Sequence, residues 1–469
     1  MCAYWNQLRS QQKTIQNAFG DGINTAVPPF QIEDTEATYL RNLDSRDYPA
    51  ASVRPGRSTY ATIATTGVNG LGQRNNSVLH VVEGNTWKYW DVASTAFVNL
   101  TTALSSTGAE FEEFVTGTNR FTLLMNSTQR LLWDGTSTAI VLGDTNAPFT
   151  NIFTVHKGRI YALKNATISF CALNATSDWT TANDAGSITI TQAKGAGTGI
   201  FEYNDKVIVF TEYSMHELYG TGPDNYELVD IEGEVGCISD RSLVKCNRRL
   251  YWLWYDGVYE YNGASITKVS DQVDDYIKNI NFTYKTKCVA GSIGDFLYVS
   301  IPHGATTNNL ILKFDTRLRK WFVETGAFTD FVTIGNTLYG VDTNGQTWNM
   351  RNESATDDAG TAINWELITK PFIENSLEGK KTLAGMYLLA EISTGSTSFS
   401  VGFSTNAQNN DSTTFTGITT LSGSSNIQNN RVQIPQNQLQ NTDWYRLRFA
   451  GTGQAKLHYL ERKYRVKSR

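Results

Sequence analysis

Hydrophobic and polar residues in this chain alternate within a recurring unit: a short strand, a tight polar turn and a second strand rich in aromatic residues. Clear copies of the unit lie at Val155–Tyr161, Lys245–Tyr251, Ile293–Tyr298 and Thr333–Tyr339. Looser copies lie at Asn75–Leu79, Gly117–Thr122 and Tyr203–Ile208. Side chains alternate between the two faces of a strand, so each unit can bury one face against the next. The pattern predicts an all-β chain made of repeats.

The length of the repeat identifies its architecture. The second strands align at Leu79, Thr122, Tyr161, Ile208, Tyr251, Tyr298 and Tyr339, which are 43, 39, 47, 43, 47 and 41 residues apart. This is the length of a four-stranded propeller blade. We therefore expect a β-propeller of about seven blades, with six as an alternative if one copy is broken. A pair of β-sandwiches would show similar strands but no regular period.

The strand-like segments at the two ends of the repeats mark its limits. Residues 59–64 (TYATIA) would open the first blade, and residues 363–368 (INWELI) would close the last blade or open the next domain. Between strands, Asp134-Gly135, Asp256-Gly257 and Asn344-Gly345 supply the positive φ angles that a hairpin turn requires. The expected domains are an N-terminal arm (1–57), the propeller (58–370) and a C-terminal β-sandwich (371–469).

The two flanking segments do not share the period. Residues 1–57 are expected either to dock on a neighbouring protein or to form a strap across the propeller; a docking arm could be removed with more harm to assembly than to folding. Four strand-like segments, Lys380–Leu389, Ser398–Ser404, Trp444–Phe449 and Lys456–Val466, suggest the sandwich. The basic end Arg462–Arg469 either touches DNA or an acidic neighbour, or is a solvated strand end.

Composition narrows the class of protein. The 469 residues are 40% hydrophobic and 12% aromatic, and the net charge of −5 lacks the basic footprint of a sequence-reading DNA binder. The five cysteines are Cys2, Cys171, Cys237, Cys246 and Cys288; their irregular spacing suggests buried thiols rather than a disulfide framework. The sequence has no secretory h-region at its start and no apolar run of about 18 residues, so we expect no membrane span.

Motifs for chemistry are weak, so we predict no enzyme and no catalytic, cofactor-binding or metal-binding residue. The acidic candidates Asp230, Glu232, Glu234, Asp271, Asp274 and Asp275 are interpreted as surface or capping groups, and the five histidines, His80, His156, His216, His303 and His458, form no metal motif. Segments resembling sialidase repeats (Val341–Trp348, Glu83–Trp87) are interpreted as hairpin turns, Gly195–Gly199 as an inter-blade loop, and Asp315–Trp321 as a solvated blade edge.

Aromatic residues near the ends of strands leave a second class of function open. Trp87, Tyr89, Trp90, Trp252 and Trp254 would stack on sugars if their rings were exposed at the blade tips. Strand alternation places about half of such residues in the core instead. A carbohydrate-recognising module is therefore the alternative, and a glycosidase ranks last because the motifs fail.

Three N-terminal motifs that precede the repeats resemble those of bacteriophage tail-hub and nozzle proteins. They are Gly22-Ile23-Asn24, the stretch from Glu36-Ala37 through Leu40 to Asp44, and Arg54-Pro55-Gly56. The strand Trp444–Arg448 and the ending Tyr464–Val466 resemble the same family. The resemblance covers the chain in order, although its motifs are short.

The resemblance implies a structural protein of the virion tail, assembled in the host cytoplasm. Members of that family form a ring, often hexameric, below the portal and adaptor; the ring encloses a DNA channel and helps to retain packaged DNA. Its partners would be other tail and adaptor proteins, and DNA would pass without sequence-specific binding. The family has no catalytic residue to transfer to this chain.

Overall fold

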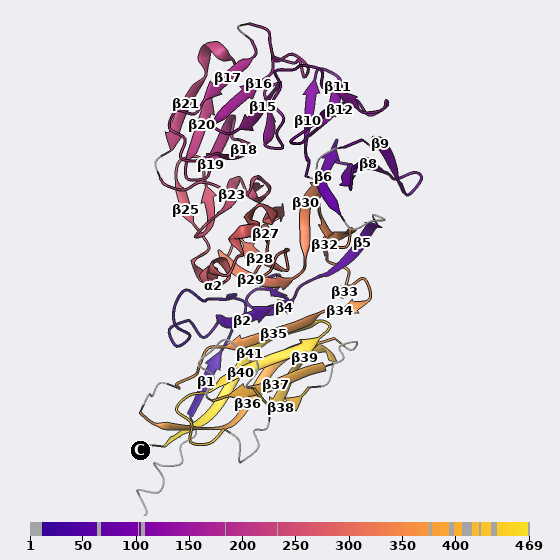
Figure 1. Ribbon diagram of the computed structural model, residues 1–469. Helices are drawn as coiled ribbons and strands as arrows, with labels where there is room; N and C mark the ends of the chain where they lie inside the picture. The colour runs from indigo at the N-terminus through magenta and orange to yellow at the C-terminus, as the bar shows by residue number, and fades with distance from the viewer. Residues whose placement is uncertain are drawn as a thin grey trace, which may run out of the picture.

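The computed structural model describes residues 12–62, 67–101, 103–104, 108–182, 184–231, 233–374, 378–393, 398–405, 415–421, 424–432 and 439–467. Seven four-stranded sheets form one body, and two larger sheets lie beside it (Figure 1). In this view the N-terminal strands β2 (Ala37–Arg41) and β4 (Ala51–Val53) lie between the two bodies, and β1 (Gln12–Gln16) lies among the strands of the second body. The chain is therefore an all-β protein with a β-propeller, as the sequence predicts.

Each of the first four blades is an antiparallel sheet whose strands follow chain order. Their strands are β6 (Val68–Arg74), β7 (Val78–Glu83), β8 (Thr86–Asp91) and β9 (Ala96–Thr101); β10 (Glu110–Thr116), β11 (Asn119–Met125), β12 (Arg130–Trp133) and β13 (Ile140–Val141); β14 (Phe153–His156), β15 (Arg159–Lys164), β16 (Thr167–Phe170) and β17 (Gly186–Thr189); and β18 (Gly197–Tyr203), β19 (Lys206–Thr211), β20 (Met215–Tyr219) and β21 (Glu227–Ile231).

The remaining three blades complete the ring. Their strands are β22 (Val244–Cys246), β23 (Arg249–Trp254), β24 (Gly257–Tyr261) and β25 (Ile266–Lys268); β26 (Val289–Ile293), β27 (Phe296–Ile301), β28 (Leu310–Asp315) and β29 (Lys320–Thr325); and β30 (Phe328–Ile334), β31 (Thr337–Asp342), β32 (Gln346–Asn352) and β5 (Gly56–Thr62). Short helices lie in the linkers: η1 (Pro223–Asn225), η2 (Asp240–Ser242), η3 (Asp271–Val273), α2 (Asp274–Lys278) and η4 (Phe282–Lys287).

The seventh blade contains a strand that the sequence analysis assigns to the first blade. The segment expected to open the first blade forms β5, which is the outermost strand of the last blade, paired with β32; residues 63 and 64 of that segment lie outside the described residues. Ala61 N donates a hydrogen bond to the buried Thr347 Oγ1 at 2.8 Å. Alternation identifies a strand but not its neighbour, whereas closing the ring pairs an edge that would otherwise be open.

Tight turns explain why the repeat is visible in the sequence. The β22–β23 turn holds Asn247 and Arg248 at φ values of 46° and 62°, and the β18–β19 turn holds Asn204 and Asp205 at 48° and 68°. Two consecutive positive φ values fit a type I′ hairpin, in which asparagine and aspartate are favoured. The polar turns that mark the period are therefore the hairpins between the first two strands of the blades.

The second body is a β-sandwich. One sheet has the order β3 (Leu43–Asp44), β4 (Ala51–Val53), β41 (Ala455–Lys467), β36 (Lys380–Ile392) and β39 (Ser424–Val432), with β1 (Gln12–Gln16) also pairing with β41. The other has the order β2 (Ala37–Arg41), β35 (Asn364–Thr369), β40 (Arg446–Thr452), β37 (Ser398–Ser404) and β38 (Thr416–Thr420). A small hairpin of β33 (Asp357–Asp358) and β34 (Thr361–Ala362) precedes β35.

Residues 12–57, which the sequence sets apart as an arm, contribute strands to both bodies. β1 and β4 pair with β41 and β2 pairs with β35, and Gly56 and Arg57 begin β5 of the seventh blade. The strand over residues 364–369 opens the sandwich rather than closing the propeller. Strands that are distant in sequence therefore tie the N-terminal segment into both domains.

One hydrophobic core runs from the propeller into the sandwich. It includes Leu312 and Trp321 of the sixth blade, Leu40 of the N-terminal segment, and Leu388 and Phe449 of the sandwich. All five side chains are fully buried. Apolar surface shared in this way favours one fixed orientation of the two domains, because separating them would expose it to water.

The N-terminal segment covers the outer edge of the sixth blade. Ile23 N donates to Trp321 O at 2.9 Å, and Asn42 N donates to Val323 O at 2.8 Å. The side chain of Asn42 continues this pairing, since its Oδ1 accepts from Thr325 N at 2.9 Å. The open edge of β29 is thereby paired with chain from outside the repeats, which protects it from association with other strands.

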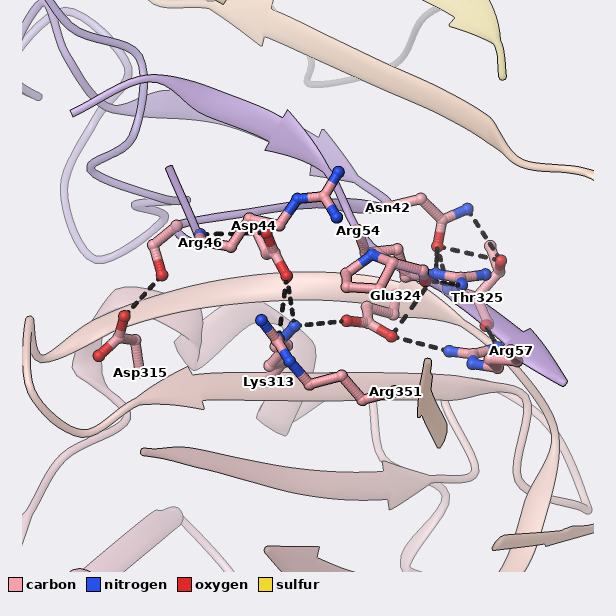
Figure 2. A network of polar contacts seen from close by, with 12 residues as sticks. Asn42, Asp44, Arg46, Arg54, Arg57, Lys313, Asp315, Glu324, Thr325 and Arg351 are labelled. Atoms are coloured by element: carbon pink, nitrogen blue, oxygen red, sulfur yellow. Dashed lines mark hydrogen bonds and ion pairs between the residues drawn. The ribbon is translucent and has the colours of Figure 1, made fainter. Parts of the chain in front are cut away.

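A buried ionic network joins the two domains (Figure 2). Lys313 Nζ lies 2.7 Å from Asp44 Oδ2 and 3.0 Å from Glu324 Oε1, and these three side chains are at most 1% exposed. Arg57 lies 2.7 Å from Glu324, and Arg351 lies 3.3 Å from Asp44. Burial alone would raise the pKa of Glu324, but the cations Lys313, Arg57 and Arg54 lower that pKa to about 2. Glu324 is therefore ionised and central to the junction.

Candidate functional site

A cavity of about 450 Å³ lies where the first strands of the blades converge. Its charged lining consists of five carboxylates and two cations: Glu110, Glu112, Glu113, Asp240, Asp330, Arg241 and Lys245. Acidic side chains outnumber lysine and arginine in this lining, so the cavity offers few contacts for phosphate groups.

Arg241, in the linker helix η2 between the fourth and fifth blades, reaches across this cavity. Its guanidinium pairs with Glu110 of the second blade and donates to Asn69 O of the first blade at 3.1 Å. Asp330 of the seventh blade lies 3.8 Å away. The adjacent Asp240 accepts a hydrogen bond from Asn151, just before the third blade, at 3.1 Å. Helix η2 thus links four other blades at the axis of the ring.

Burial perturbs the acids of this axial cavity. It raises the pKa of Glu112 to about 7, although hydrogen bonds, including one from Thr154 Oγ1 at 3.4 Å, lower that pKa. Burial also raises the pKa values of Asp240 and Asp330, although Arg241 opposes the shift in both. These carboxyls are costly to ionise together, because burial disfavours the charged form and the charge of Asp330 opposes the ionisation of Asp240. Glu112 can exchange a proton near neutral pH.

Three residues of the fourth blade have the spacing of a catalytic triad. Ser214 Oγ lies 2.8 Å from His216 Nε2, and His216 Nδ1 lies 3.2 Å from Asp230 Oδ1. His216 and Asp230 face each other across β20 and β21, a pairing that hairpin register could have revealed from the sequence. Ser214, however, is only 1% exposed, and its Oγ is also bonded to Thr211 Oγ1 at 2.6 Å. In this conformation a substrate cannot reach the hydroxyl. The hydrogen bonds of Ser214 instead stabilise the β19–β20 turn.

The other four histidines lie apart. Trp87 Nε1 donates to His80 Nδ1 at 3.1 Å, His156 faces Glu202 at 3.9 Å, His303 packs on the ring of Tyr276, and His458 Nε2 lies 2.9 Å from Glu391. Within the described ranges, no group of three or more His, Cys, Asp or Glu side chains could hold a metal ion.

The acidic candidates do not come together as a pair for catalysis. Asp271 and Asp274 share Lys268, at 3.3 Å and 2.9 Å, and Asp275 is exposed on α2. Glu234 lies at a surface cleft beside Lys194, and Glu232 is outside the described residues. Asp271 and Asp274 thus share one lysine as their counter-ion.

The weak motifs have structural roles. In Val341–Trp348, Asp342 accepts hydrogen bonds from Asn344 N and from Trp348 Nε1, at 2.8 Å and 3.0 Å, which fixes the β31–β32 hairpin. Asp315 is fully buried and accepts from Ser45 Oγ at 2.6 Å, so the turn that it begins faces the N-terminal segment rather than only solvent.

The aromatic candidates divide between the core and the surface. Trp87 and Trp252 are buried at 0% and 1% exposure. Tyr89 stacks on Trp133 and Trp90 packs against Phe97. Trp254 is half-buried and lines a cleft with Lys194, Tyr213, Glu234 and Tyr255. Sequence reasoning missed Tyr213 and Tyr255, which stand in hairpin turns next to strand ends.

The described thiols and Arg462, the first residue of the basic C-terminal end, are buried. Cys171, Cys237, Cys246 and Cys288 are buried and unbridged, and burial raises the pKa of each thiol; Cys2 lies outside the described residues. Arg462 is 1% exposed and pairs with Glu374 at 2.9 Å, so this first residue of the basic end is unavailable to DNA. Residues 468–469 lie outside the described residues.

No helix among the described residues is long and apolar enough to cross a membrane. No protein-family model matches the sequence, and no curated protein matches it.

Solved structures with a similar fold include virginiamycin B lyase from Staphylococcus aureus, at 10% identity and a TM-score of 0.44 over 62% of this chain and 97% of that one. BamB from Moraxella catarrhalis is similar at 10% identity and a TM-score of 0.39, over 73% of this chain and 99% of that one. These likenesses concern the fold and no activity.

Proposed function

We propose that this chain is a structural protein of a bacteriophage tail, which assembles into a ring of hub or nozzle type below the portal and adaptor. The ring would enclose the DNA channel and help to retain packaged DNA. The observation that supports this proposal most strongly is the position of the three N-terminal motifs that resemble that family. All three lie at the junction of the propeller and the sandwich.

Each motif has a definite task at this junction. Gly22-Ile23-Asn24 contacts β29, where Ile23 N bonds to Trp321 O. The second motif ends at Asp44, which pairs with Lys313. The third begins at Arg54, whose guanidinium binds Asp358 at 2.6 Å. The residues that resemble the family therefore have structural roles at the junction of the two domains.

A fixed junction suits a ring protein. Subunits close into a ring only if each presents its two contact surfaces at a constant angle. The shared hydrophobic core and the buried network around Lys313 and Glu324 hold that angle here. Flexible domains would lose conformational entropy at every contact.

The DNA path in this proposal lies between subunits and not through the propeller. The propeller axis is crossed by Arg241 and lined by an excess of carboxylates. The whole chain carries a net charge of −5. Few phosphate contacts would let DNA slide without sequence-specific binding, because attraction to the backbone depends on Lys and Arg.

Light scattering on the purified full chain tests the proposal, first alone and then mixed with the other tail and adaptor proteins of the virion. A hexamer has six times the 52.1-kDa mass of the chain. A closed assembly near that mass, alone or on a partner, supports the ring. A monomer under both conditions overturns it.

A further inference from the structure

A surface cleft of about 600 Å³ lies between the fourth and fifth blades. Lys194 precedes β18, Tyr213 is in the β19–β20 turn, Glu234 follows β21, and Trp254 and Tyr255 form the β23–β24 hairpin. Four separate stretches of chain therefore meet in one place. None of the five residues lines the axial cavity, and Trp254 and Tyr255 pack against the edge of the shared hydrophobic core.

The rings of this cleft form a floor and a wall. Tyr213 and Tyr255 are nearly parallel, with centroids 5.8 Å apart and planes inclined by 16°. Trp254 is almost perpendicular to Tyr213, at 86°. Tyr213 is 43% exposed, which is unusual for a large aromatic side chain held in a defined stack. A flat ligand can therefore lie on one ring and abut another.

Hydrogen bonds fix two of these rings, Trp254 and Tyr255, before any ligand arrives. Trp254 Nε1 donates to Glu212 O at 3.0 Å, and Tyr255 Oη donates to Glu212 Oε1 at 2.5 Å. Lys285 Nζ donates to the same carboxylate at 2.7 Å, and the hydrogen bonds from Lys285 and Tyr255 lower the pKa of Glu212. Binding to rings that are already ordered costs little conformational entropy.

The rim of the cleft carries polar groups of both signs. Lys194 Nζ lies 3.3 Å from Glu234 Oε1, and their side chains are 49% and 86% exposed. An exposed pair of this kind contributes little stability. Its ammonium can donate, and its carboxylate can accept, hydrogen bonds with a ligand that lies on the rings.

These features together select the ligand class. A cation is disfavoured, because the ammonium of Lys285 already lies 4.7 Å from the centre of the Tyr255 ring and Lys194 lies at the rim. A nucleic-acid phosphate is disfavoured by the carboxylates of Glu212 and Glu234. A pyranose ring has an apolar C–H face that suits the negative face of an aromatic ring, and hydroxyls that suit Lys194 and Glu234.

We propose that the cleft formed by Lys194, Tyr213, Glu234, Trp254 and Tyr255 is a carbohydrate-binding site that takes one pyranose ring of a glycan. Tyr213 supplies the stacking face, Trp254 forms the wall, and Lys194 and Glu234 bind hydroxyls. The site would add contact with a sugar-coated surface to the proposed role in tail assembly. The observations that support it do not depend on ring formation.

The test is binding of the full-length chain to an array of immobilised glycans that terminate in hexoses, N-acetylhexosamines or deoxyhexoses, followed by titration with the best binder. Tyr213→Ala should weaken binding at least tenfold, whereas Tyr213→Phe should retain it because the stacking face remains. Phe149→Ala is the matched control, since Phe149 is a similarly exposed aromatic residue, at 40%, elsewhere on the surface.

Thermal unfolding of each variant shows whether its fold is intact, and Glu234→Gln provides a second reading if Tyr213→Ala unfolds. Loss of affinity in Glu234→Gln or in folded Tyr213→Ala, with Phe149→Ala unchanged, supports the site. No binding by the wild-type chain to any glycan, or equal binding by all variants, overturns it. The mass of the assembly is read separately, so failure here leaves the ring proposal standing.

Discussion

His80 is held neutral by its surroundings. Its side chain is fully buried, and its Nδ1 accepts a hydrogen bond from Trp87 Nε1. Burial, helped by the charge of Arg74, lowers the pKa of this imidazole to about 3. Between its unfolded pKa of about 6.5 and this value, the unfolded chain binds a proton that the folded chain does not. The free energy of unfolding therefore falls as the pH decreases through this window.

His80→Gln should reduce the acid sensitivity of the fold. Glutamine keeps an acceptor for Trp87 but does not titrate, so the drop in melting temperature between about pH 7 and about pH 4.5 should be smaller than in the wild type. Thermal unfolding monitored by circular dichroism measures it, with the partly exposed His458→Gln as control. An unchanged drop would show that His80 is not an acid-sensitive group.

Glu112→Gln should act in the opposite direction. Burial raises the pKa of Glu112 to about 7, so its contribution is present at low pH and is lost as the pH rises through that value. The variant should melt higher than the wild type at about pH 8 and differ little at about pH 4. Glu227→Gln, at an exposed position, serves as control. Equal effects of Glu112→Gln at both pH values would contradict a charge-based cause.

At the scale of elements, close backbone approach makes one glycine of the first motif essential. Gly22 has a φ of 73°, and a Cβ atom there would lie 2.3 Å from Trp321 O on β29. Gly84 has a similar φ of 58°, but no described atom lies within 4 Å of its Cβ position. A side chain would be strained by the backbone conformation at both positions, but only at Gly22 would it also clash with a neighbouring strand.

Gly22→Ala should therefore destabilise the chain by clearly more than Gly84→Ala, for which the left-handed backbone costs about 1–2 kcal/mol. Chemical denaturation of both variants measures the difference. Equal losses would mean that β29 and the N-terminal segment separate easily, against the close pairing described above.

Lys313→Met should be among the most damaging single changes at the junction. It leaves the carboxylates of Asp44 and Glu324 without their shared cation in a site of at most 1% exposure, and breaking a buried pair in this way costs about 3–5 kcal/mol. Lys278→Met removes an exposed pairing and should cost less than about 1 kcal/mol. If the denaturation curves of the two variants coincide, the network does not stabilise the junction.

At the scale of the molecule, removal of residues 1–57 should abolish folding. The sequence suggests an arm whose loss spares the fold, but the deletion would remove Asp44 and Arg54 from the junction, the strands β1 to β4 and the first two residues of β5. The truncated chain should be insoluble or lack a cooperative melt, as circular dichroism would show. A soluble truncated chain with a cooperative transition would mean that the two domains fold without these strands.

The propeller could be predicted from the sequence because its signals are local. Hairpin turns such as Asn247-Arg248 and the alternation after them recur at a fixed period. Long-range pairings could not be predicted from the sequence. No residue near Thr59 in the chain indicates that it pairs with β32, and no residue near Arg462 indicates that it pairs with Glu374. Trp254 was a candidate from the sequence, but Tyr213 joins it only because two blades pack side by side.

Electron cryo-microscopy of the assembled protein is the decisive test of the proposed ring. We expect a symmetric ring with a channel between subunits, in which each subunit holds its propeller and sandwich in the single orientation fixed by Asp44, Lys313 and Glu324. Isolated subunits, or subunits whose two domains take up variable orientations, would contradict it.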